Sequence, residues 1–179
     1  GLTDYDEEPP SDDEEIGWLL GPFSNPNDGI MDDIHPLRDA WAGDNCSIIS
    51  ENPPGGGAIG VAYVNGAFNH LTRSALGGTL HTHEFGHNVG MLHAKGDGPP
   101  AEECDESSPG DSCRTPCETL STGNFNYGWR FRGSTSLCFR TVMAYSPGTR
   151  ILNFSNPEVI YDGSPTGVPV GELQQADGY

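Results

Sequence analysis

The chain has 179 residues, a length that suits one globular domain. It carries 26 acidic residues against 8 lysines and arginines, for a formal net charge of −18. A chain this acidic is a poor partner for nucleic acid, because phosphate contacts need a basic face. It contains no apolar run of about 18 residues, so no membrane span is predicted.

The first 15 residues are expected to form an acidic, weakly ordered tail, because they offer few apolar side chains to bury. Their carboxylates could gather Ca²⁺, but the spacing is not that of an EF-hand loop, so no motif supports a calcium site. Residues 16–179 are predicted to form a single domain.

The first elements of this domain are predicted from apolar spacing and from glycine and proline. Residues 16–20 form a short apolar run that fits a strand. Apolar residues recur at helical spacing over 28–41, in spite of one proline, and predict a helix. Residues 47–50 fit a short buried strand, 53–57 a loop and 58–64 another strand.

The strongest pattern lies on a helix predicted over 79–89 and reads His-Glu-x-x-His, with His83, Glu84 and His87. Residues four apart lie on one helix face, with their Cβ atoms about 5–6 Å apart. The two imidazoles can therefore bind one zinc ion at about 2.0–2.1 Å each. Glu84 is too close to His83 in sequence for a comfortable third ligand. It fits the role of a base toward a water held at the metal.

The pattern continues as Gly-x-x-His, with Gly90 and His93. Gly90 is predicted to end the helix through positive φ, where a residue with Cβ would be strained. The bend lets His93 return to the metal as the third protein ligand, whereas His81 is expected to point away. Three neutral imidazoles and a water define a catalytic type of zinc site, in which the metal lowers the pKa of the water.

Residues 97–123 are rich in Gly, Pro, Ser and Thr and predict a surface loop braced by disulfides. Five cysteines occur in the chain, so pairing would leave one over. Proximity in the loops favours the pairs Cys104–Cys113 and Cys117–Cys138. A second zinc site built from cysteines of this loop is the alternative, although no Cys-x-x-Cys pair occurs.

The segment that follows adds a second motif, Thr-Val-Met-Ala-Tyr over 141–145, and a short strand is predicted over 159–161. Together, the histidine motif and the Met143-x-Tyr145 sequence resemble those of the metzincin zinc endopeptidases. The surrounding residues, with 125–131, are most similar to bacterial reprolysin-like peptidases. The Met-x-Tyr form is similar to that of astacins and serralysins.

The resemblance implies an α+β, zincin-like fold of the metzincin type. Such a fold has a short twisted mixed sheet with an edge strand over the cleft, a zinc-binding helix and a loop-rich C-terminal subdomain. Residues 16–93 and 94–179 would form the two subdomains. The resemblance places Met143 in a tight turn beneath the zinc and Tyr145 near the metal or the oxyanion. The alternatives are that Met143 is an ordinary core methionine and that Tyr145 is a packed aromatic residue.

Residues 58–64 resemble the edge strand of these enzymes. An edge strand offers backbone N–H and C=O groups to which an extended peptide can add. The candidate substrate-binding residues are therefore Gly60, Val61, Ala62 and Tyr63. The alternative is that they are simply part of the sheet.

The resemblance covers about residues 28–167. Reprolysin-like domains have a further strand–helix–strand unit before the helix at 28–41 and end in a long helix. We therefore expect either a fragment or a minimal member with a trimmed sheet, whose small core needs support from disulfides, calcium or a partner.

Two functions fit these observations. The first is a zinc-dependent metalloendopeptidase that hydrolyses extended polypeptides with one catalytic Zn²⁺ and a zinc-bound water activated by Glu84. The second is a non-catalytic zinc-binding remnant or structural module of a larger secreted protein. Either is expected outside the cell, in a processed form without a signal segment. The acidic surface favours basic or neutral substrates, while specificity and oligomeric state are not predicted.

Overall fold

The computed structural model describes residues 16–51, 58–98, 113 and 126–169. It divides the chain into two compact units, residues 1–89 and 90–179. The tail expected over 1–15 and the loop expected over 53–57 lie outside the described residues, as does most of the loop over 97–123. Among the described residues, no helix is long and apolar enough to cross a membrane.

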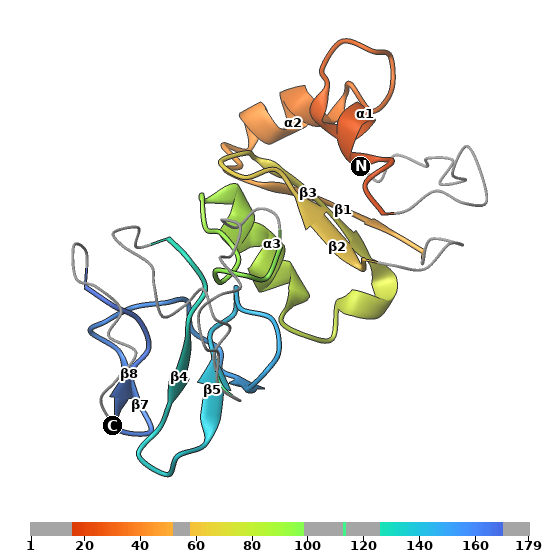
Figure 1. Ribbon diagram of the computed structural model, residues 1–179. Coiled ribbons are helices and arrows are strands. Elements are labelled where there is room, and N and C mark those ends of the chain that lie inside the picture. Colours follow the sequence, from red (N-terminus) through yellow and green to blue (C-terminus); the bar gives the residue numbers. More distant parts are fainter. Residues whose placement is uncertain (1–15, 52–57, 99–112, 114–125, 170–179) are drawn as a thin grey trace. The chain divides into compact units, whose positions relative to one another are not determined.

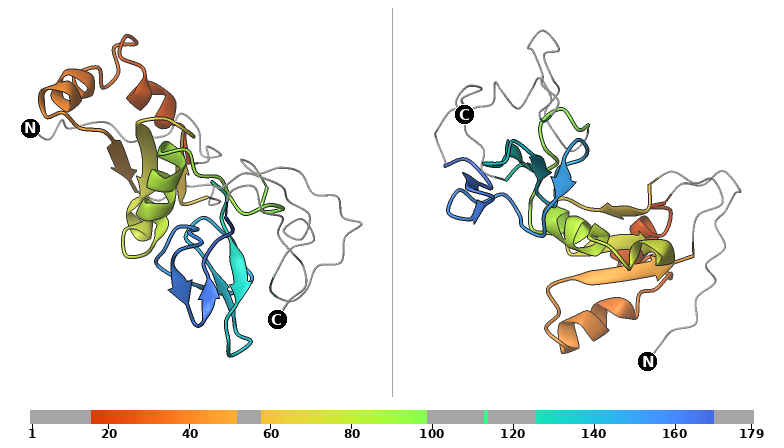
Figure 2. Two further views of the ribbon diagram at one scale, coloured as in Figure 1. Left: turned by 90° about the vertical axis from the view of Figure 1, so that its left-hand side faces the viewer. Right: turned by 90° about the horizontal axis from the view of Figure 1, so that it is seen from below.

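The first unit is a three-stranded sheet with helices on both faces (Figures 1 and 2). The middle strand pairs parallel with one neighbour and antiparallel with the other, in the order β1-β3-β2. The strands are β1 (Cys46–Ser50), β2 (Gly60–Ala62) and β3 (Phe68–Thr72). The helices are α1 (Leu20–Ser24), α2 (Ile34–Ala40), the 3-10 turn η1 (Arg73–Ala75) and α3 (Leu80–Asn88).

Both faces of strand β3 are covered, and all five of its residues are buried. Phe68 meets Phe23 of α1 edge-on, with ring centroids 5.2 Å apart. Asn69, on the opposite face, donates a hydrogen bond to Asn88 of α3. A strand covered on both faces has no polar face, so its sequence does not alternate between apolar and polar residues. For that reason the sequence pattern does not predict this central strand.

The prediction of a strand over 16–20 is wrong. Residues 16–19 form a turn, and α1 begins at Leu20. Gly17 has φ of 114°, which turns the chain, and its carbonyl accepts a hydrogen bond from the Leu20 N–H. Leu19 and Leu20 of this run are buried together with Phe23, in the apolar cluster that contains Phe68 of β3.

The helix predicted over 28–41 is shorter in the structure, where only Ile34–Ala40 is helical. Gly29 and Met31 have positive φ and hold the preceding residues in turns. Pro36 is tolerated because it lies in the first turn of α2, where its missing N–H is not needed. Trp41, expected on the apolar face, is 80% exposed. The predictions of strands at 47–50 and 58–64 and of the helix over 79–89 are confirmed as β1, β2 and α3, although β2 covers only Gly60–Ala62 and only Ser50 of β1 is fully buried, where a buried strand was expected.

The second unit contains short strands (Figure 1). These strands surround an aromatic core. Strand β5 pairs antiparallel with β4 and parallel with β6, and a separate two-stranded hairpin follows. The strands are β4 (Arg130–Arg132), β5 (Cys138–Arg140), β6 (Thr149–Arg150), β7 (Ile160–Tyr161) and β8 (Ser164–Pro165). The core residues are Trp129, Phe131, Phe139 and Ile151. Strand β7 confirms the prediction over 159–161.

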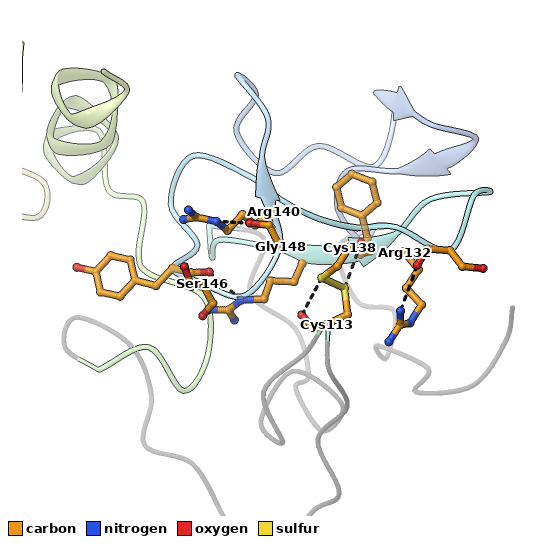
Figure 3. Close-up of a disulfide and its surroundings, with 10 residues drawn as sticks. Cys113, Arg132, Cys138, Arg140, Ser146 and Gly148 are labelled. Carbon is orange, nitrogen blue, oxygen red and sulfur yellow. Dashed lines mark hydrogen bonds between the residues drawn. A yellow bond between two sulfur atoms is a disulfide. The ribbon is translucent and has the colours of Figure 1, made fainter. Parts of the chain in front are cut away.

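Among the described residues of this unit, a disulfide joins Cys113 to Cys138 on β5 (Figure 3). Each predicted pair contained one of these two residues, so both predicted pairs are wrong. The alternative of a zinc site using the Cys113 thiolate is also wrong, because that sulfur is oxidised. Separation along the chain is a poor guide to pairing, since the bond depends on how strands bring distant residues together. Cys46 is a free thiol.

Candidate metal centre and active site

Helix α3 presents His83 and His87 on one buried face. The two side chains are four residues apart, and their rings meet edge-on with centroids 4.8 Å apart. Both residues are buried, and so is Gly86 between them. The helix packs against β2 and β3, which holds this face of α3 in place.

Asn88 fixes the C-terminal end of α3 to the sheet. Its side-chain N–H groups donate to the carbonyls of Tyr63 (3.0 Å) and Phe68 (2.9 Å). Its side-chain oxygen accepts hydrogen bonds from Asn45 and Asn69. These bonds satisfy both the N–H groups and the oxygen of the buried Asn88 amide. Sequence reasoning did not single out Asn88, because an asparagine inside a metal motif has no distinctive spacing of its own.

Gly90 has φ of 91°, the left-handed conformation that the sequence analysis expects there. His93 follows, and it is buried. The ligand atoms of His83, His87 and His93 all lie within 4.8 Å of one another. A zinc ion holds each imidazole nitrogen at about 2.0–2.1 Å, so three nitrogens grouped in this way could share one ion. The donor set therefore fits a catalytic zinc ion.

The two nitrogens of His93 have different surroundings. Nδ1 lies 3.4 Å from the carbonyl oxygen of Gly98, which can accept a hydrogen bond from an Nδ1–H. Nε2 then carries the lone pair, as a metal ligand requires, and the Tyr145 hydroxyl lies 3.1 Å from it. A carbonyl that fixes the tautomer of a ligating imidazole is the common supporting arrangement in metal sites.

Glu84 lies on the same helix and is only 3% exposed. Burial raises the pKa of its carboxyl group to about 8. Without a nearby cation the group is therefore largely protonated at neutral pH, whereas a divalent cation beside it would favour the carboxylate. A Cβ built on Gly60 of β2 would lie 2.6 Å from Oε1 of Glu84. The strand thus approaches this carboxyl as closely as only a glycine allows.

We predict that Gly60→Ala reduces any catalysis that depends on the Glu84 carboxyl by about 10- to 100-fold while zinc stays bound, because the new methyl group displaces that carboxyl. Metal content and kcat/KM on a protein substrate are the measurements. Gly21→Ala is the control, since a Cβ at that position meets nothing within 4 Å. An unchanged kcat/KM in Gly60→Ala would mean that this approach does not position Glu84.

Met143 is buried within a hydrogen-bonded turn. The Ala144 N–H donates to the Thr141 carbonyl over 3.1 Å, and Met143 is 1% exposed. A Cβ on Gly128 would lie 2.6 Å from the Met143 carbonyl carbon, so the two backbones pack in direct contact. The turn exists, and the role of Met143 beneath a metal stays a prediction, as does the structural role of Gly90.

A buried ion pair holds the backbone of Tyr145. Arg130 is fully buried, the Asp97 side chain is 4% exposed, and the two form a salt bridge. The other Asp97 oxygen accepts the Tyr145 N–H (2.7 Å), and Arg130 Nε donates to the Tyr145 carbonyl (3.0 Å). Both sides of the Tyr145 backbone are therefore fixed. No sequence motif points to Asp97 or Arg130, since only the fold brings them together.

The candidate substrate-binding residues lie on or next to an edge strand, as expected. Gly60, Val61 and Ala62 form β2, which pairs only with β3 among the described strands of this sheet. Tyr63 lies just beyond the strand and is 45% exposed. Their role toward a peptide stays a prediction.

The chain is similar to three proteins named peptidyl-Asp metalloendopeptidase. It is 27% identical over 162 residues to that of Stenotrophomonas maltophilia (strain R551-3), covering 82% of this chain and 32% of the relative. It is 29% identical over 171 residues to that of Xanthomonas campestris pv. campestris, covering 87% and 32%. It is 25% identical over 174 residues to that of S. maltophilia (strain K279a), covering 88% of this chain and 34% of the relative. The chain thus spans about a third of the length of these relatives.

No family model matches the chain, and no solved structure matches it. The similarity to metalloendopeptidases and the group of three histidines together support a zinc metallopeptidase. The mixed α+β architecture with small sheets is consistent with that class.

Proposed function

We propose that this chain is a metzincin-type, zinc-dependent endopeptidase. The observation that carries the proposal is the buried group of His83, His87 and His93, with Glu84 directly after the first of them on the same helix. When bound, zinc polarises a substrate carbonyl and lowers the pKa of water.

The residues of the chain have separate roles in this proposal. The three imidazoles hold the ion, and Glu84 takes a proton from the attacking water and passes it to the leaving amine. Tyr145 steadies the negative charge that develops on the substrate oxygen, as its hydroxyl next to His93 allows. The turn at Met143 supports the site from below. Strand β2 receives the extended substrate backbone through its edge.

The names of the relatives suggest the substrate. All three are named for action on a peptidyl-aspartate bond. We therefore propose that this chain cleaves polypeptides next to an aspartate. We also propose that it acts outside the cell, where a disulfide such as Cys113–Cys138 is stable.

A non-catalytic zinc module remains the second candidate. Burial of Glu84 argues against it, because the burial raises the pKa of the carboxyl group and is a cost that a purely structural zinc site does not require.

The test is metal content measured together with cleavage of a generic protein such as casein, from pH 5 to 9. We expect about one zinc per chain, with cleavage that stops when a chelator removes the metal and returns when zinc is restored. A folded, zinc-loaded sample without cleavage at any pH would instead establish the non-catalytic module.

A further inference from the structure

Three arginines converge on one short loop of the second unit. Arg140 donates from Nε to the Gly148 carbonyl (Figure 3) and from Nη1 to the Ala144 carbonyl, both over 2.8 Å. Arg150 donates to the same Ala144 carbonyl over 3.2 Å. Arg130 donates to the Tyr145 carbonyl. Guanidinium groups from β4, β5 and β6 therefore meet around residues 144–148.

The charge of this group is opposite to that of the chain as a whole. The sequence has only 8 lysines and arginines and a net charge of −18, yet three arginines gather here with Asp97. Burial and then the charge of Arg130 lower the pKa of Arg140. Burial and then the charge of Arg140 lower the pKa of Arg150. The cations repel one another, so an anion placed among them would gain from all of them.

The three arginines differ in how far they reach the surface. Arg130 is fully buried and bound to Asp97, so it stabilises the interior of the unit and does not reach a ligand at the surface. Arg140 and Arg150 are half-buried, and both act on the single Ala144 carbonyl. These bonds to backbone carbonyls hold the two guanidinium groups beside one another, and paired guanidinium groups are the chemistry that recognises a carboxylate through parallel hydrogen bonds.

This pair of arginines is next to the tyrosine of the candidate active site. Ala144, which accepts from both, directly precedes Tyr145, whose hydroxyl lies 3.1 Å from Nε2 of His93. Tyr145 also acts electrostatically on Arg150 and raises its pKa, against the larger effect of burial. An anion at the pair would thus be close to the group that contacts a metal-binding histidine.

We propose that Arg140 and Arg150 recognise the carboxylate of an acidic substrate side chain beside the scissile bond. The proposal rests on the peptidase function and names the residues that select its substrate. The overall acidic charge favours basic or neutral substrates, but it acts over long range and is screened by salt beyond about 8 Å. At the site itself, the two arginines reverse the local charge.

The experiment separates binding from cleavage. Peptides with blocked ends are compared that differ only in one residue beside the cleavage site, Asp or Asn. A third peptide carries Asn and a free C-terminal carboxylate. Binding is measured by calorimetry on the zinc-loaded chain with Glu84→Gln, which holds the substrate without turning it over. Cleavage is measured on the chain with Glu84 intact. Each measurement is repeated with Arg150→Gln and with Arg140→Gln.

We expect the Asp peptide to bind about 10- to 100-fold more tightly than the Asn peptide, and Arg150→Gln to remove most of that difference. The affinity for the Asn peptide should differ by less than about twofold between the chains with and without Arg150→Gln. Equal binding of Asp and Asn peptides, or an Asp preference that survives both substitutions, would overturn the proposal. Tight binding only by the peptide with the free terminus would also overturn it, since the pair would then read a chain end.

Two controls keep the result interpretable. Arg73→Gln removes an arginine that is 70% exposed and pairs with Glu51, and it should leave the Asp preference unchanged. Arg150→Lys keeps the charge but loses the fork, so it should retain part of the preference even if Arg150→Gln fails to fold. Charge-dependent binding without any cleavage would refute the proposed peptidase function, and only the carboxylate-binding role of Arg140 and Arg150 would stand.

Discussion

Replacing Glu84 with glutamine is expected to reduce turnover of a protein substrate by about 10²- to 10⁴-fold, the usual contribution of a general base. A glutamine at this position would keep the size of the side chain but could not accept a proton from water. Zinc binding should persist, because the three imidazoles are unchanged. Removing a carboxyl whose pKa burial raises to about 8 should leave the metal-free chain at least as stable at pH 8.

The measurements are zinc per chain, kcat/KM and thermal unfolding, made on the same preparations. Glu158→Gln is the matched control, since it changes an exposed glutamate in the same way and should leave all three unchanged. Full activity in the Glu84→Gln variant would rule the mechanism out. Loss of zinc in that variant would show that Glu84 is a ligand, not a base.

The second large effect is expected at the buried ion pair. Asp97→Ala leaves the fully buried Arg130 guanidinium without its carboxylate and removes the acceptor of the Tyr145 N–H. Breaking a buried pair from one side typically costs about 3–5 kcal/mol in the free energy of unfolding. Urea denaturation followed by tryptophan fluorescence measures this loss, because Trp129 is buried in the same unit.

The control for this prediction is the exposed pair of Arg38 and Asp39. The Asp39 side chain is 69% exposed, so Asp39→Ala should cost less than about 1 kcal/mol. Removing both buried charges with Asp97→Ala and Arg130→Met should restore part of the stability, since no unpaired charge is left. A loss for Asp97→Ala as small as that for Asp39→Ala would mean that the pair does not hold this unit together.

The metal site was predictable because its physical requirement is local. Two ligands four residues apart on one helix and a third after a glycine bend are fixed by short spacing, and the residues fold as that spacing predicts, with α3 and with φ of 91° at Gly90. Strands β1 and β2 were predictable for a similar reason, because short apolar runs lie between turn residues.

The remaining features depend on contacts between distant segments. Strand β3 contains Asn69 and His70, which look unlike a strand until the sheet buries both. Asp97 and Arg130 are 33 residues apart and carry no motif. Residues 16–20 are apolar because they cover β3, a reason that fits a helix as well as a strand. The pairing of Cys113 with Cys138 likewise follows from where β5 runs.

Zinc content of the wild-type chain and of His83→Ala, His87→Ala and His93→Ala is the most direct measurement of the claim that one ion is shared between this helix and the residue beyond its glycine bend. We expect about one tightly held zinc per wild-type chain, and weakened zinc binding with loss of cleavage in each variant. X-ray absorption on the wild type should find three nitrogen ligands at about 2.0–2.1 Å. A His93→Ala variant that holds zinc as tightly and cleaves as fast as the wild type would contradict the account.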